Sequence, residues 1–456
     1  MQLPRSPPDT LPVLRDLFRR GDIAWNVAPT LPDSRYLHWD ELLYRPPPAG
    51  LSPEQWWALV RLARSQRAHP IEAMTRCYDV PFSVVDLPGI QRSLHELDRT
   101  HVGERILSAL GNRDAQIEYR VRQLIEEAIS SSEIEGARPT TRELARQMLR
   151  EKRPPTTRDE RMIVNNLRAM QRLRELHEAG ELLSLSHLLE LHRILGEGAL
   201  DVDGAAGALR GPAHEVVLMD LEGNVWHRPP PAAGIEARVD QLLRFANDLG
   251  DEADPFIHPI VRAIATHFWL GYEHPFRDGN GRMARALYYW CMLRHGYEVA
   301  EFLSISGPID RSPKAYYLAF AHSECDAGDL TYFVLHQLDV MKAAMNDLLS
   351  HLSRRAERLR ALSAVVASFD SLNHRQRALL EHAVHHPEQG QTIEGHATSH
   401  AVHYMTARSD LANLEARGLL ESRRVQKKKR YYLSQTLRQS AAHQKARTTR
   451  TKSSRA

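Results

Sequence analysis

The stretch HPFRDGNGRMAR, residues 274–285, decides how this chain folds around its chemistry. It connects two segments whose apolar residues recur at helical spacing, FIHPIVRAIATHFWLGYE before it and RMARALYYWCMLRHG after it. Proline disfavours a helical conformation in the residue before it, so the first helix should stop at His274, which precedes Pro275. The stretch is therefore predicted to be a tight connection between two helices.

An anion site is expected where the second helix begins. Gly279, Asn280 and Gly281 lie there, where unpaired backbone N–H groups and the helix dipole favour negative charge and glycines let a phosphate approach the backbone. Arg282 and Arg285 are three residues apart on the first turn and add positive charge on one side of the helix.

The acid and the histidine of the stretch complete a reaction centre. Asp278 beside a phosphate would be repelled unless a divalent cation lay between them, which predicts Mg²⁺ bound by Asp278. His274, at the other end of the turn, suits a general base acting on an incoming hydroxyl. Together these residues predict phosphoryl or nucleotidyl transfer.

The full pattern, H-x-F-x-D-G-N-G-R-x-x-R, would occur by accident with a probability on the order of 10⁻⁸. It resembles the signature of the Fic (Fido) family, with every defining position matched. The resemblance implies transfer of AMP from Mg-ATP to a Ser, Thr or Tyr hydroxyl of a target protein, or of this protein itself, with release of pyrophosphate. It assigns the base to His274, the metal to Asp278, the phosphates to Gly279, Asn280, Gly281 and Arg282, and the γ-phosphate to Arg285.

A β-hairpin is predicted in HEVVLMDLEGNVWHR, residues 214–228, where two β-prone runs flank a DLEGN turn before three prolines. Its edge could pair with an extended peptide, or the segment could simply cover the core. The resemblance implies the first of these, a flap that docks the target along Val216, Val217, Leu218 and Met219.

A second segment, EYRVRQLIEEAISSSEIEGARP, residues 118–139, predicts a helix over about 114–136. Ile117, Val121, Leu124, Ala128 and Ser132 share one face, and helical spacing returns Glu135 to it. A buried acid needs a basic partner; alternatively, the helix frays before this residue and leaves the acid solvated.

SSSEIEG in this segment resembles the inhibitory motif of Fic proteins, with Ser131, Glu135 and Gly136 at its defining positions. The resemblance implies that Glu135 pairs with Arg285 and denies the γ-phosphate its seat. An inhibitory helix N-terminal to the signature would make a separate inhibitor protein unnecessary.

The predicted fold class is mainly α: a Fic/Fido helical core with a β-hairpin flap, and a C-terminal winged-helix domain. The expected organisation is an N-terminal accessory region over 1–99, a Fic domain over 100–345, a linker helix over 346–370, a winged helix-turn-helix over 371–436 and a disordered basic tail over 437–456. The accessory region holds four of the seven tryptophans, Trp25, Trp39, Trp56 and Trp57, which are expected to anchor its core.

In the C-terminal part, helical segments are followed by two short strands around a basic turn, ESRRVQKKKRYYL. This order resembles bacterial winged-helix regulators, and Lys427, Lys428, Lys429 and Arg430 are candidate DNA contacts. A winged helix used for dimerisation or for protein contact fits the same pattern.

Composition sets the outer bounds. The net charge is only +3, which does not make the chain a polycation. The three cysteines, unclustered and odd in number, predict neither a disulfide framework nor a zinc site. No signal peptide or membrane-length apolar run is seen, so a cytoplasmic protein without a membrane partner is expected. A homodimer stays open, as do two other functions: a nucleotide-sensing transcription regulator, and an enzyme that removes AMP with Glu135 activating water.

Overall fold

The computed structural model describes residues 3–21, 35–76, 80–99, 113–138, 142–151, 153–202, 204–214, 216–219, 222–250, 255–367, 372–385, 390–400, 402–425, 428–435 and 437. The chain divides into two compact units, Met1–Leu348 and Leu349–Ala456. Trp25, Lys427 and nearly all of the predicted basic tail lie outside the described residues.

The first unit is mainly helical, as predicted. Its helices are α1 Thr10–Arg20, α2 Trp39–Leu42, α3 Pro53–Ser65, α4 Pro88–Arg99, α6 Arg113–Ile134, α7 Arg142–Glu151, α8 Arg158–Glu178, α9 Leu185–Gly196, α10 Ile235–Ala246, α11 Pro259–Glu273, α12 Asn280–Arg294, the 3₁₀ helix η2 Glu298–Phe302, α13 Ser306–Arg311, α14 Pro313–Cys325 and the start of α15 Thr331–Ala367. Its strands are β1 Ala68–Thr75, β2 Pro81–Val85, β3 Leu218–Met219 and β4 Val225–His227.

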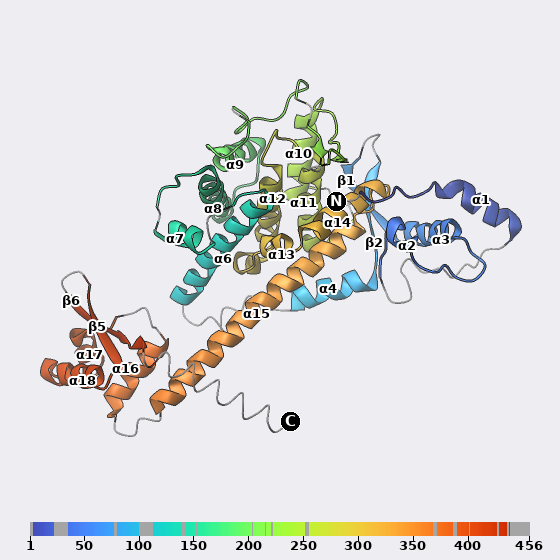
Figure 1. Cartoon of the computed structure of the whole chain (residues 1–456). Coiled ribbons are helices and arrows are strands. Elements are labelled where there is room, and N and C mark those ends of the chain that lie inside the picture. The colour runs from blue at the N-terminus through green and yellow to red at the C-terminus, as the bar shows by residue number, and fades with distance from the viewer. Residues whose placement is uncertain are drawn as a thin grey trace. The chain divides into compact units, whose positions relative to one another are not determined.

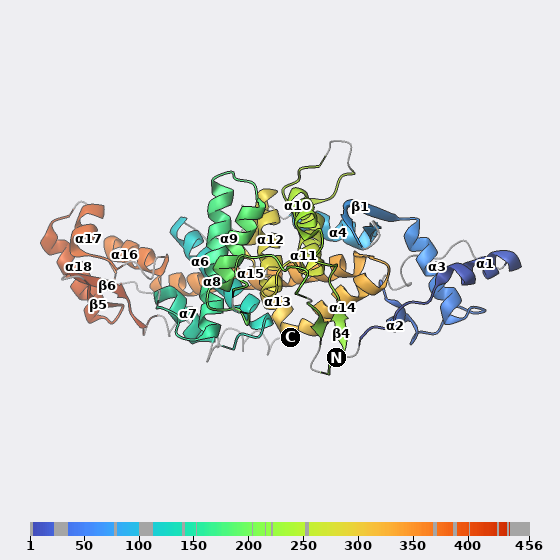
Figure 2. The same ribbon diagram turned by 90° about the horizontal axis from the view of Figure 1, so that it is seen from above.

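Helices α8 to α12 stand side by side as a bundle in both views of the chain (Figures 1 and 2). Helices α11 and α12, which flank the signature, pack closely against each other at its centre. Both are buried almost all round, with Phe268, Trp269 and Trp290 each at most 1% exposed. Burial of large apolar side chains on this scale is the dominant stabilising contribution, so the signature turn is held between two helices of the buried core.

The N-terminal region shares this core. Strands β1 and β2 pair antiparallel, with Ala68 opposite Val85, and Phe82 of β2 is fully buried in the same apolar cluster as α11 and α12. Trp39, Trp56 and Trp57 form a separate cluster between α2 and α3, in the anchoring role predicted for tryptophan. The hairpin β1–β2 was not predicted from the sequence.

Helix α6 differs from its predicted burial pattern in its first two turns. Leu124, Ala128 and Ser132 are buried as expected, but Ile117 is 41% and Val121 47% exposed. Helical periodicity gives the direction in which a side chain points, but it does not tell whether another element extends far enough to cover that side chain. The prediction was therefore wrong for these two residues.

Helix α15 is continuous from Thr331 to Ala367. The predicted linker helix over 346–370 is therefore an extension of the last helix of the first unit and not a separate element. The boundary between the two units falls inside it, after Leu348.

The second unit has the order of elements that its sequence predicts. Helices α16 His374–His385, α17 Ile393–Ser399 and α18 Tyr404–Ala416 precede the hairpin β5 Leu420–Val425 and β6 Lys428–Leu433. Leu380, Leu411, Leu414 and Leu433 form a core of its own. Within the described residues of the chain, no helix is long and apolar enough to cross a membrane.

Candidate active site

The signature forms the predicted turn between two helices. Helix α11 ends at Glu273 and is capped by His274, whose φ of 45° is left-handed, and α12 begins at Asn280 after Gly279, whose φ is 80°. The Asn280 side chain accepts from the Phe276 N–H and donates to the Phe276 carbonyl oxygen, at 2.9 and 2.8 Å. Asn280 thus braces the turn with its side chain, which leaves only its backbone for the predicted phosphate contact.

His274 lies at the inner end of this turn. Its Nδ1 is 3.0 Å from the Gly271 carbonyl oxygen, a contact that places the proton on Nδ1 and leaves Nε2 as the basic nitrogen. Burial lowers the pKa of His274 to about 4. The ring is therefore neutral near pH 7, as a general base must be before it accepts a proton.

Arg210 holds the backbone beside this histidine. Its Nε donates to the His274 carbonyl oxygen at 2.7 Å, and its Nη2 donates to the Glu273 carbonyl oxygen at 3.1 Å. Only 4% of Arg210 is exposed. These bonds satisfy carbonyl groups that the end of α11 leaves without helical partners, and they fix the strained residue in place.

Asp278 is held by backbone groups. Its Oδ1 accepts from the Gly279 N–H at 2.6 Å and its Oδ2 from the Asp201 N–H at 2.9 Å. His192 of α9 donates from Nε2 to the Asp278 carbonyl oxygen at 2.9 Å and stacks on Phe276 at 3.7 Å. A half-buried carboxylate fixed in this way is the hard oxygen donor that Mg²⁺ prefers, with phosphate and water as its other ligands.

The two arginines of α12 are both buried. Arg282 is 1% exposed, and its Nη1 donates to the Leu195 carbonyl oxygen at 2.9 Å. Its Nε has no hydrogen-bond partner within the described residues. Arg285 donates from Nε to the Ser131 hydroxyl and from Nη2 to the Ser131 carbonyl oxygen, both at 2.8 Å.

Glu135 reaches the same place from α6. The helix ends at Ile134 and Gly136 has a left-handed φ of 89°, yet the Glu135 carboxylate has a basic partner and is only partly exposed. Its Oε1 lies 2.8 Å from Nη2 of Arg285, with 28% of the side chain exposed. A Cβ added to Gly281 would lie only 2.0 Å from this oxygen. The carboxylate therefore sits directly over the N-terminus of α12, where an anion is favoured.

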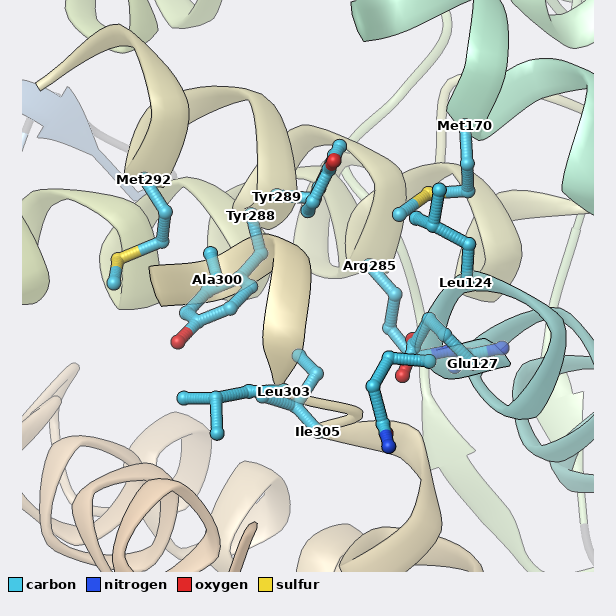
Figure 3. Close-up of a pocket in the computed structure, with 11 residues that line it drawn as sticks. Leu124, Glu127, Met170, Arg285, Tyr288, Tyr289, Met292, Ala300, Leu303 and Ile305 are labelled. Atoms are coloured by element: carbon cyan, nitrogen blue, oxygen red, sulfur yellow. The ribbon is translucent and has the colours of Figure 1, made fainter. Parts of the chain in front are cut away.

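The body of α6 is anchored well away from Glu135. The buried Glu127 accepts from the Ser304 hydroxyl at 2.8 Å and from the Ser306 N–H at 3.0 Å. Figure 3 shows Glu127 and Arg285 at one small, mostly apolar pocket that α6 and α12 line with η2. These contacts fix the position from which α6 presents Glu135 to Arg285.

The predicted flap is a short antiparallel hairpin, β3–β4, with Leu218 opposite His227. Met219 is 60% exposed, Val216 and Val217 precede β3, and residues 215, 220 and 221 lie outside the described part. His227 secures the hairpin: its Nδ1 pairs with Glu324 of α14, and its Nε2 lies 2.8 Å from the Tyr272 carbonyl oxygen. The rings of His227 and His274 are 6.2 Å apart.

Three residues of the site were missed by the sequence reasoning: His192, Arg210 and His227. His227 stands inside the predicted flap, and among the described residues of that flap it is the ionisable side chain that is buried. His192 and Arg210 carry no local signal, because the groups that they hold lie 86 and 64 residues away. Tyr316 of α14 is buried beside His267.

The chain was compared with models of protein families. The Fic/DOC family profile fits residues 182–292, which include the whole signature but not α6 or the second unit.

Among curated relatives, the protein adenylyltransferase fic-1 of Caenorhabditis briggsae is 33% identical over 161 residues, which are 35% of this chain and 27% of that protein. The protein adenylyltransferase Fic of Drosophila grimshawi is 33% identical over 115 residues, which are 25% of this chain and 21% of that protein. The chain thus spans about a quarter of the length of these relatives.

Among solved structures, a Fic family protein from Desulfovibrio desulfuricans G20 superposes with a TM-score of 0.50 at 21% sequence identity. The superposition covers 77% of this chain and 97% of that one. At this identity the likeness concerns the fold alone.

Proposed function

We propose that the Fic/DOC family domain carried by residues 182–292 is a protein adenylyltransferase that Glu135 of the same chain holds inactive. The single observation that carries the proposal is the Glu135 carboxylate, 2.8 Å from Arg285 and directly over Gly281. In this proposal the carboxylate occupies the position at the start of α12 where the phosphate oxygens of ATP would bind. The substrates are Mg-ATP and a protein hydroxyl, in the cytoplasm.

Each of the site residues has a step in the proposed reaction. The neutral His274 accepts the proton of the target hydroxyl through Nε2, the hydroxyl oxygen forms a bond to the α-phosphorus of ATP, and the bond to pyrophosphate breaks. Backbone N–H groups at the start of α12 and the buried Arg282 stabilise the phosphate oxygens. Mg²⁺ bound by Asp278 would neutralise phosphate charge.

The flap binds the second substrate, which is the target protein. An extended target segment adds as a strand along residues Val216 to Met219, and the anchored His227 holds that edge beside His274. Main-chain pairing places a target hydroxyl without requiring a particular target sequence.

The test compares wild type, Glu135→Gly and Glu135→Gly/His274→Ala in a cell lysate with Mg²⁺ and ATP labelled at either the α- or the γ-phosphorus. Label from the α-position alone, stronger in Glu135→Gly and lost in the double variant, is the expected result. Loss of label from a pre-AMPylated protein, greater in wild type than in Glu135→Gly, would instead indicate AMP removal, with Glu135 acting on water.

For the second unit we propose DNA binding through α18 and the hairpin β5–β6. Arg408 on α18 and Arg423 and Arg424 on β5 are exposed, which gives these two elements cations able to contact phosphates. Arg423 also pairs with Glu421 at 2.6 Å. Lys429 pairs with Glu415 at 2.9 Å, so its charge is partly neutralised. The side chains of Lys427 and Lys428 are outside the described residues.

The test is binding of random duplex DNA at increasing salt. Loss of affinity with salt, together with a shallower salt dependence in Arg423→Gln/Arg424→Gln, supports DNA contact. Binding that the double variant leaves unchanged contradicts it.

A further inference from the structure

A cluster of metal-binding side chains lies outside the signature, where the N-terminal region meets the end of α14. His38 precedes α2, Asp40 is in its first turn, and His322 is 282 residues further along the chain from Asp40. One nitrogen or oxygen atom from each of the three lies within 4.8 Å of the others. The fold thus brings together two imidazoles and a carboxylate from two distant segments.

Of the two distances to Asp40 within the cluster, one equals the separation of neighbouring ligands of one ion and the other is shorter. Nε2 of His322 is 3.3 Å from Oδ1 of Asp40, and Nδ1 of His38 is 2.7 Å from the same oxygen. In a tetrahedral site with bonds of about 2.0–2.1 Å, neighbouring ligand atoms are about 3.3 Å apart. The three ligand atoms are therefore close enough together to surround one ion once the two rings have turned toward it.

The charges around the cluster favour a cation. Asp326, next to Cys325, is matched by Arg61 at 2.9 Å, but within the described residues the ion-pair partners of Asp40 are His38 and His322. Side-chain exposure is 0% for His38, 9% for His322 and 21% for Asp40. The cluster is most exposed to solvent at Asp40, so an ion and a water ligand can enter there.

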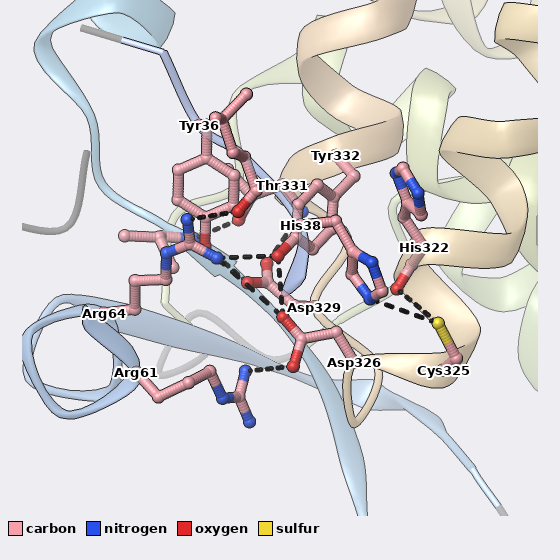
Figure 4. Close-up of polar contacts among 12 residues, drawn as sticks. Tyr36, His38, Arg61, Arg64, His322, Cys325, Asp326, Asp329, Thr331 and Tyr332 are labelled. Atoms are coloured by element: carbon pink, nitrogen blue, oxygen red, sulfur yellow. Dashed lines mark hydrogen bonds and ion pairs between the residues drawn. The ribbon is translucent and has the colours of Figure 1, made fainter. Parts of the chain in front are cut away.

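Cys325 completes the surroundings of His38. Figure 4 shows the two side chains facing each other, with the Cys325 sulfur 3.3 Å from Nε2 of His38. If Nδ1 binds an ion, the proton of the neutral ring is on Nε2, and this N–H donates a hydrogen bond to the sulfur. Histidine ligands of metals usually make such a second hydrogen bond, which fixes the tautomer and the ring orientation.

We propose that His38 through Nδ1, Asp40 and His322 through Nε2 bind one divalent transition-metal ion, for which Zn²⁺ is the first probe. Two imidazoles, one carboxylate and an open position suit Zn²⁺, and imidazole ligands select against Mg²⁺. The two rings stack 4.2 Å apart at 12°, and a nitrogen lone pair lies in the plane of its ring. Binding therefore tilts the rings apart and ties α2 to α14.

The test uses the full chain, stripped with a chelator and carrying Asp278→Ala to remove the signature carboxylate. Zn²⁺ is titrated against a chromogenic chelator, and Co²⁺ is used for its visible absorption bands. One ion per chain is expected, with affinity at least about ten-fold weaker in His38→Gln and His322→Gln. The control His69→Gln, an exposed residue of β1, should bind as tightly as its parent.

Equal affinity in His38→Gln/His322→Gln and in the control, or no binding at all, overturns the proposal. Cys325→Ser keeps an acceptor for Nε2 and should bind within about three-fold of its parent; a loss as large as that of His38→Gln contradicts binding through Nδ1. Because His38 also caps α2, X-ray absorption of the Zn²⁺-loaded parent gives a test without its substitution. Scattering from two imidazoles is expected, and its absence is decisive against the site.

Discussion

Oε1 of Glu135 and Nη2 of Arg285 are 2.8 Å apart, although 150 residues separate them in the chain. Arg285 makes two further bonds to Ser131, so both its Nε and its Nη2 are engaged by the end of α6. Under the proposed function, these contacts keep Arg285 from binding the γ-phosphate of ATP.

Removing the carboxylate should release this arginine. Glu135→Gly and Glu135→Gln are expected to raise the rate of AMP transfer at least about ten-fold, because a charge-assisted bond to a buried arginine is lost. The measurement is incorporation of label from α-labelled ATP. Glu143→Gln, an exposed glutamate of α7, is the control, and equal rates in it and in Glu135→Gln would show that the pair does not inhibit.

Gly281→Ala separates inhibition from phosphate binding. Its Cβ would lie 2.0 Å from Oε1 of Glu135 and would displace that carboxylate. Since phosphate is proposed to occupy the same space, Gly281→Ala should be inactive, and Glu135→Gly/Gly281→Ala should lose most of the activity of Glu135→Gly. A fully active double variant would place the phosphate elsewhere.

Arg210→Lys tests the support of the general base. Lysine cannot reproduce the two bonds that Arg210 makes to the carbonyl oxygens of Glu273 and His274. In the Glu135→Gly background we expect kcat to fall about ten-fold, with KM for ATP within two-fold. Arg244→Lys on α10 serves as the control, and a change confined to KM would assign Arg210 to nucleotide binding instead.

The flap anchor should matter for the protein substrate only. His227→Gln and Glu324→Gln each break the pair that joins β4 to α14, and we expect transfer to lysate proteins to fall about three- to ten-fold. Binding of a fluorescent ATP analogue should not change. If the two residues act as a pair, the double variant is no worse than either single one, whereas additive losses would deny the coupling.

Buried histidines predict how stability depends on pH. Burial lowers the pKa of His192 to about 4 and that of His267 to about 3, from an ordinary value of 6.5. Between these values and 6.5 the unfolded chain binds more protons, so the free energy of unfolding rises with pH up to about 6.5, by at most about 1.4 kcal/mol per pH unit for each histidine.

Urea unfolding from pH 4.5 to 7.5 measures this slope. His267→Gln should make it shallower, whereas His69→Gln, at an exposed position, should not. Equal slopes in the two variants would mean that His267 does not titrate as its burial requires.

The sequence determined those features that depend on neighbours along the chain. Helices flank residues 274–285 because apolar spacing and Pro275 specify them locally, and the flap hairpin follows from its turn residues. The chemistry of His274, Asp278 and the two arginines could be predicted because one short turn holds all four. The resemblance of a second short motif added the pairing of Glu135 with Arg285.

Tertiary structure decided what depends on residues far apart. The exposure of Ile117, the bracing of the turn by His192 and Arg210, and the anchoring of His227 by Glu324 depend on segments that are far apart in the sequence. The cluster of His38, Asp40 and His322 is the extreme case, since neither segment alone has the spacing of a metal motif. Local periodicity fixes the direction of a side chain, but packing of the whole core fixes what it meets.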